Sequence, residues 1–308
     1  MTQPLSDAYL AKAEQDAKRF RYIPTLPSHI QKLVTEIRRL QSIKPALTNP
    51  PLVDTINRHA VSLVKNKNAT TDRSIYSKQD PYAQVFVRNE SCWLNSIRNL
   101  TCVSPAQLSG TPWNQRAGTL ITKKHIIYAN HFGIPVIDGG TPILFVTRDN
   151  KVIERRLIKQ LSDSSTDIAI GLLDSNLPDS IEIASVLPPD FEKYLGARNS
   201  FLIVTFDAEE KANIQQCNTF FNGGFSINTL NESYVAPEYR QLSAWSEATI
   251  VGDSGNPSFT IIYDELVLLG CFWTSMGGSN VGSKQELVNS MIEQLSPREG
   301  YSLKIKML

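Results

Sequence analysis

The sequence has no long hydrophobic run, no excess of either charge and few cysteines. A transmembrane helix needs about 18 consecutive apolar residues, and no stretch of this sequence comes near that length. The N-terminus, Met1-Thr2-Gln3-Pro4, lacks a basic segment followed by an apolar one, so we expect no secretory signal. With 31 basic and 30 acidic residues, the whole chain has no charge that would attract nucleic acid. These absences predict a soluble globular protein without a membrane contact.

Cysteine is scarce, and its spacing excludes the common metal sites. Cys92, Cys102, Cys217 and Cys271 form no C-x-x-C pair and match no zinc-ligand spacing. Without a secretion signal, free buried thiols in an intracellular or intravirion setting are expected, although a Cys92–Cys102 disulfide stays open. We expect no metal ion and no other cofactor.

The first 80 residues are basic and helical. They carry 13 Lys and Arg against 7 Asp and Glu, whereas the rest carries 18 against 23. Apolar residues recur every three to four positions over Leu10–Phe20, Ile30–Leu40 and Leu52–Val64, which predicts three helices. The polar stretch 65–80 is interpreted as a linker. This helical N-terminal extension, 1–80, must bury its apolar faces on itself, on the next domain or on a protein partner. We do not expect nucleic acid as the partner, because no aromatic residues alternate with the basic ones.

From Tyr82 onward the chain consists of short β-rich runs separated by turn residues. Ten such runs lie between residues 83 and 272, and they favour barrels or a sandwich over βαβ units. A final periodic segment, Lys284–Leu295, predicts a C-terminal helix.

The loop Val251-Gly252-Asp253-Ser254-Gly255-Asn256-Pro257 is the strongest candidate for a chemical role. A serine between glycines predicts a tight loop that presents one hydroxyl while backbone N–H groups converge beside it. That geometry suits a nucleophile next to an oxyanion hole. A plain surface turn explains Gly-x-Ser-Gly at least as well, so the interpretation depends on a histidine and a carboxylate elsewhere.

Both partners occur upstream, in contexts that resemble one family. His131 ends the run Ile126-Ile127-Tyr128-Ala129-Asn130-His131. Asp167 opens the apolar run Ile168–Ile170, 36 residues after His131 and 87 before Ser254. The order of the three residues, the Gly-Thr-Leu-Ile run at 118–121 and the Gly-Asp-Ser-Gly motif resemble the trypsin-like (chymotrypsin-fold) serine peptidases. The resemblance covers about residues 82–296.

The resemblance implies a fold and a reaction. The fold would be mostly β: two six-stranded antiparallel β-barrels over 81–188 and 189–308, with a C-terminal helix. The protein would be a serine endopeptidase that cleaves a polypeptide substrate through an acyl-enzyme. Ser254 would be the nucleophile, His131 the general base and Asp167 its orienting carboxylate. The backbone N–H groups of Gly252 and Ser254 would form the oxyanion hole.

The resemblance also places the pocket for the residue before the scissile bond (S1). Ala248, six residues before the serine, would lie at its base beside Thr249, and Trp273 would form a wall. Because neither Ala248 nor Thr249 carries a negative charge, we expect a small or apolar residue there rather than Arg or Lys.

Several positions depart from the family pattern. Asn256 replaces a glycine. This substitution should disturb the loop little, because asparagine tolerates the left-handed backbone conformation. Phe272 replaces a serine that commonly supports the catalytic aspartate, so that support must come from elsewhere or be absent. Phe132 and Ile250 replace cysteines.

Asp253 raises the question of activation. In secreted members this acid pairs with a new N-terminal amine made by cleavage, but no matching cleavage sequence occurs here. We expect an internal partner for Asp253, so that the intact chain is active. The alternative function is a catalytically weak or inactive scaffold that uses the basic helical extension to bind a protein.

Overall fold

The computed structural model describes residues 52–105, 118–195, 200–221, 223–230, 237–250, 252–272 and 277–308. All the described residues belong to one compact unit. The first two expected helices, within 1–49, lie outside the described residues. None of the helices in the described ranges is long and apolar enough to cross a membrane.

A five-stranded antiparallel sheet forms the first half of the β-rich region. Its strand order is β3-β4-β7-β6-β5. The bounds are β3 (Thr119–Leu120), β4 (His125–Ala129), β5 (Thr141–Val146), β6 (Val152–Asp163) and β7 (Ile168–Leu173). Strands β4 and β7 are buried throughout, and every residue of β4 pairs with a residue of β7, so they form the centre of the sheet.

A seven-stranded sheet forms the second half, in the order β14-β11-β10-β9-β12-β13-β8. The bounds are β8 (Ser185–Val186), β9 (Phe201–Phe206), β10 (Ala212–Phe221), β11 (Gly224–Asn228), β12 (Pro257–Ile262), β13 (Glu265–Cys271) and β14 (Gly277–Ser279). The sheet curls, so that β14 at one edge meets β13 near the other. Glycines permit this contact, because a Cβ on Gly278 would lie 2.1 Å from Cys271 O.

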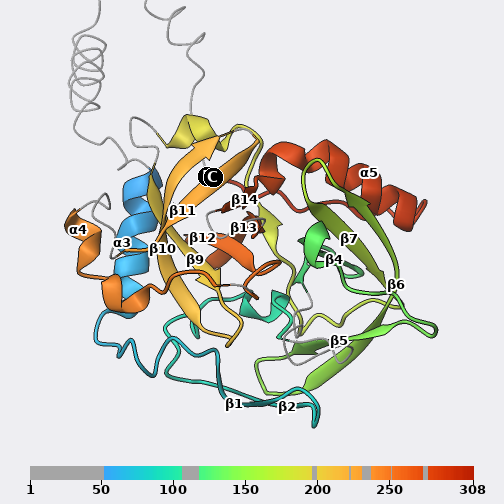
Figure 1. Cartoon of the computed structure of the whole chain (residues 1–308), viewed down its shortest axis with the longest axis horizontal. Helices are drawn as coiled ribbons and strands as arrows, with labels where there is room; N and C mark the ends of the chain where they lie inside the picture. Colours follow the sequence, from blue (N-terminus) through green and yellow to red (C-terminus); the bar gives the residue numbers. More distant parts are fainter. Residues whose placement is uncertain are drawn as a thin grey trace, which may run out of the picture. The chain divides into compact units, whose positions relative to one another are not determined.

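The mostly β fold with a C-terminal helix is confirmed. Helix α5 (Gln285–Leu295) buries four apolar side chains and packs on β6 and β7 (Figure 1). Most expected β-rich runs are strands, but the run expected at 248–251 is irregular over residues 248–250. The strand at residues 76–80 and strands β8, β10, β11 and β14 were not expected. The described residues hold sheets of five and seven strands. Two closed six-stranded barrels, and a boundary between them at residue 188, stay predictions.

Helix α3 (Leu52–Val64) belongs with the sheets. Its bounds match the expected third helix, and it packs on β9 and β12. Buried Asn57 links three elements: its Oδ1 accepts a hydrogen bond from Leu202 N at 2.8 Å, and its Nδ2 donates to Tyr239 Oη. The apolar face of this helix is therefore buried on the β-rich region, one of the three options that the sequence leaves open.

The prediction of a linker over 65–80 is wrong for its last five residues. Residues 76–80 form β1 (Tyr76–Asp80), which pairs with β2 (Val85–Arg88). Ile75 and Tyr76 are buried, and Ile75 N donates to Glu210 O at 2.9 Å. This stretch is thus fixed to the body of the protein.

Short helices connect the strands. They are η3 (Leu100–Cys102), η4 (Asn130–Phe132), η5 (Phe191–Tyr194), α4 (Pro237–Arg240), η6 (Ser243–Trp245) and η7 (Val281–Lys284). The four cysteines are free thiols, as expected, so no Cys92–Cys102 disulfide exists.

Candidate active site

Strand pairing brings His131 and Asp167 together. Ala129 at the end of β4 pairs with Ile168 at the start of β7, so the residues after β4 adjoin those before β7. Asn130 N donates to Asp167 O at 2.9 Å and extends the ladder by one step. His131, in η4, therefore meets Asp167 as a direct result of antiparallel register.

Both oxygens of the Asp167 carboxylate bind His131. Oδ1 accepts from His131 N at 2.7 Å, and Oδ2 lies 2.6 Å from His131 Nδ1. The carboxylate side chain is 5% exposed, whereas the imidazole is 39% exposed. A carboxylate at Nδ1 favours the neutral tautomer that carries its proton there, which leaves Nε2 as an acceptor. The two hydrogen bonds fix the orientation of the imidazole ring.

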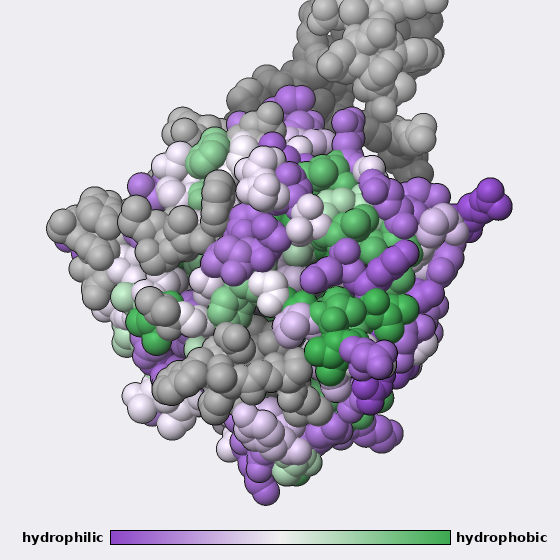
Figure 2. Space-filling view, turned by 45° about the vertical axis from the view of Figure 1, so that its right-hand side comes forward, coloured by the Kyte–Doolittle hydropathy of each residue, from purple (hydrophilic) through white to green (hydrophobic). Residues whose placement is uncertain are grey.

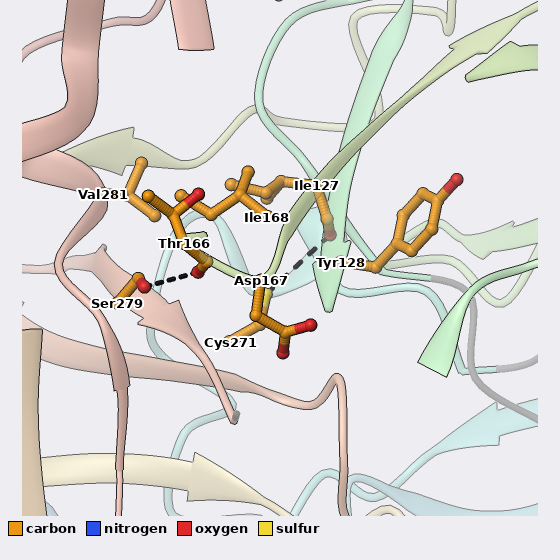
Figure 3. Close-up of a pocket in the computed structure, with 8 residues that line it drawn as sticks. All are labelled: Ile127, Tyr128, Thr166, Asp167, Ile168, Cys271, Ser279 and Val281. Carbon is orange, nitrogen blue, oxygen red and sulfur yellow. Dashed lines mark hydrogen bonds between the residues drawn. The ribbon is translucent and has the colours of Figure 1, made fainter. Parts of the chain in front are cut away.

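A small cavity lies behind Asp167 (Figure 3). Its volume is about 10 Å³, near the lower limit for one water molecule, so no substrate side chain fits in it. Cys271 lines this cavity, and burial, followed by the charge of Asp167, raises the pKa of its thiol to about 12. The Cys271 thiol is thus a neutral neighbour of the carboxylate.

The loop around Ser254 is tightly turned by its glycines. Gly252 has φ of +107° and Gly255 has φ of +83°, a region that other residues rarely occupy. Gly255 N donates to Phe272 O at 3.2 Å, and Phe272 N donates to Asn256 O at 3.0 Å. These bonds fix the loop to the end of β13.

Asn256 fits into the loop, but not because of a left-handed backbone, as expected. Its backbone lies outside the left-handed region. The side chain is buried, and its Nδ2 donates to Phe206 O. Asn256 therefore ties the loop to the end of β9.

Asp253 has partners within the chain. Its Oδ1 accepts from Ala208 N at 2.9 Å, and its Oδ2 accepts from Ile250 N at 2.8 Å. The carboxylate is buried, and these charge-assisted bonds satisfy it without a new N-terminal amine. The prediction of an internal partner is confirmed.

The Ser254 loop packs against the turn that carries His131. A Cβ on Gly255 would lie 3.4 Å from Phe132 Cδ1 and 3.9 Å from Ala129 Cβ. The residue after Ser254 thus touches the residue after His131. Ser254 itself is half-buried.

The backbone N–H groups of the loop differ in their bonding. Those of Asp253 and Asn256 donate to Ile250 O and Asp253 O. Gly252 N donates to no residue within the described ranges. An unengaged N–H beside a serine suits binding of an oxyanion.

The S1 prediction stays a prediction. Ala248 is exposed and Thr249 is half-buried on the segment before the loop, and Trp273 lies outside the described residues. Within the described ranges, no group of three His, Cys, Asp or Glu side chains is placed to hold a metal ion.

The sequence did not identify Ser279 as a site residue. Its Oγ donates to Thr166 O, immediately before Asp167, from a strand of the other sheet. No local motif marks it, since the contact depends on how the two sheets meet. Phe272, which is buried, offers Asp167 no side-chain hydrogen bond.

A scan against protein-family models and a search of the curated proteins found no match to this sequence.

Proposed function

We propose that this protein is a trypsin-like serine endopeptidase that cleaves peptide bonds through an acyl-enzyme. The observation that carries the proposal is the bidentate Asp167–His131 pair beside the Ser254 loop, with Gly255 packed on Phe132. In this proposal the nucleophile, the base and the orienting acid come from three segments of the chain that the fold brings together.

The reaction follows from these positions. Ser254 Oγ attacks the carbonyl carbon of the scissile bond while His131 Nε2 takes its proton. Asp167 holds the ring and stabilises the imidazolium. The C–N bond breaks, the leaving amine takes the proton from His131, and the acyl group stays on Ser254. Water then attacks the ester carbon while His131 Nε2 takes a proton from it. The C–O bond to Ser254 breaks, His131 returns the proton to Ser254 Oγ, and the carboxylic acid leaves.

The negative charge that develops on the carbonyl oxygen in the transition state must be stabilised by hydrogen-bond donors. The N–H groups of Gly252 and Ser254 are the proposed donors, and loss of one such donor typically costs about 3–4 kcal/mol of transition-state stabilisation. The positive φ of Gly252 would orient its peptide toward the oxyanion.

The finer features of the family complete the proposal. The two sheets would belong to two six-stranded barrels, with the site between them. Ala248, Thr249 and Trp273 would line an uncharged S1 pocket that accepts a small or apolar residue. The substrate would be a polypeptide.

Hydrolysis of peptide esters tests the proposal, with the intact chain and a panel of residues before the ester bond. We expect turnover by the wild type, loss in Ser254→Ala and retention in Ser258→Ala. Ser258 is a matched control, since it is buried in β12 four residues away and its Oγ has no partner. No turnover by a folded wild type would favour the scaffold. Turnover only after removal of residues 1 to about 85 would refute an enzyme active as synthesised.

A further inference from the structure

Asp167 occupies an unusual backbone conformation. Its φ is +54°, in the left-handed region that non-glycine residues seldom adopt. Such a conformation costs on the order of 1 kcal/mol and persists only where the surrounding structure holds it. In this conformation both oxygens of the carboxylate bond to His131.

Two hydrogen bonds hold the peptide groups on either side of Asp167. Asn130 N donates to Asp167 O from the neighbouring strand of the same sheet. On the other side, Ser279 Oγ donates to Thr166 O, and Figure 3 shows this bond reaching across from β14. Ser279 is buried, so water does not compete readily for the carbonyl.

The second sheet is shaped to place Ser279 there. Gly278 fits against Cys271 O, and Gly270 fits against Ser279 O, where a Cβ would lie only 2.1 Å away. These glycines let β14 approach β13 closely beside the Asp167 peptide. Thr166, Asp167, Cys271 and Ser279 then line the same small cavity.

We infer that Ser279 is a positioning residue for the Asp167–His131 pair. It fixes the Thr166–Asp167 peptide and so the direction of the carboxylate, a support that Phe272 cannot give from its own side chain. The kinetic consequence of this inference rests on the proposed peptidase function, whereas the structural consequence does not.

The test compares Ser279→Ala with the wild type of the full chain. Loss of one hydrogen bond that orients a catalytic group should lower kcat about tenfold and leave KM nearly unchanged. The acid-side midpoint of the kcat/KM profile should move to lower pH, since the imidazolium is then less well stabilised. Ser279→Thr keeps the hydroxyl and should restore most of the rate.

The matched control is Ser296→Ala. Ser296 is also a buried serine, and its Oγ bonds to His125 Nε2 at 2.9 Å, in another part of the fold. Both alanine variants should lower the melting temperature. Only Ser279→Ala should change kcat and the pH profile.

A second measurement needs no turnover. The proton between His131 Nδ1 and Asp167 Oδ2 should give a far-downfield proton resonance, identified by its loss in His131→Gln. Ser279→Ala should shift or broaden it, and Ser296→Ala should leave it in place. If the wild type shows no turnover, the proposed function fails and the resonance still decides the role of Ser279. If turnover is normal and Ser279→Ala alters neither kcat nor the resonance, the inference is overturned and the proposed function stands.

Discussion

Protonation of His125 should make the fold sensitive to acid. His125 is fully buried at the start of β4, with Nδ1 2.8 Å from Thr122 Oγ1 and Nε2 2.9 Å from Ser296 Oγ. Burial, followed by the charge of Lys124, lowers its pKa from 6.5 to about 4. The folded state then binds fewer protons than the unfolded state between these values. The contribution of neutral His125 to the free energy of unfolding is therefore fully present above pH 6.5. It falls as the pH drops and levels off below about pH 4.

The size of this effect follows from the same shift. A difference of about 2.5 pH units corresponds to about 3 kcal/mol. Urea unfolding at a series of pH values, compared between the wild type and His125→Asn, isolates this contribution from the other titrating groups. We expect the wild type to lose about 3 kcal/mol more than the variant between about pH 7.5 and about pH 4. Parallel stability curves for the two proteins would refute the assignment of His125 as a buried neutral group.

Three further predictions concern other parts of the structure. Asn57→Ala should lower the free energy of unfolding by about 1–3 kcal/mol in urea titrations, because it leaves buried Leu202 N unsatisfied; an unchanged midpoint would contradict the docking of α3. Gly278→Ala should destabilise the protein severely in thermal melts, since its Cβ would lie 2.1 Å from Cys271 O; a normal melt would mean that β13 and β14 do not abut. Asp167→Asn should reduce ester turnover by roughly four orders of magnitude through the wrong His131 tautomer, and a loss under tenfold would exclude the proposed role.

The contact between His131 and Asp167 could be predicted from the sequence more readily than the architecture around it. His131 and Asp167 each adjoin a long apolar strand, and pairing of those strands suffices to bring them together. Helix α3 was predictable because its apolar residues follow the helical period. Strand β1 was missed because only its first residue, Tyr76, is buried and the next four are exposed, so no alternation marks it.

Contacts made by tertiary packing could not be predicted from local sequence patterns. Ser279 reaches Thr166 O only because the curled sheet places β14 beside the start of β7. Asn256 likewise binds a carbonyl 50 positions earlier in the chain. Both roles depend on tertiary packing rather than on neighbouring residues.

Apolar side chains are also exposed on the surface of the five-stranded sheet and its connections. Figure 2 shows hydrophobic and hydrophilic residues side by side on the face turned forward. Ile137 and Ile158 are exposed, and Gly140, which bonds through its N–H to Ile137 O, lies against Ile158. Apolar exposure of this extent is ordinary on protein surfaces.

Covalent labelling of the intact chain by a fluorophosphonate tests the central claim most directly. Ser254 Oγ should displace fluoride from phosphorus, with His131 accepting the proton, and mass spectrometry should locate the adduct on the peptide that contains Ser254. Labelling should disappear in Ser254→Ala and fall sharply in His131→Gln. A folded wild type that takes up no label, or a label on another residue, would contradict a Ser254–His131–Asp167 hydrolase.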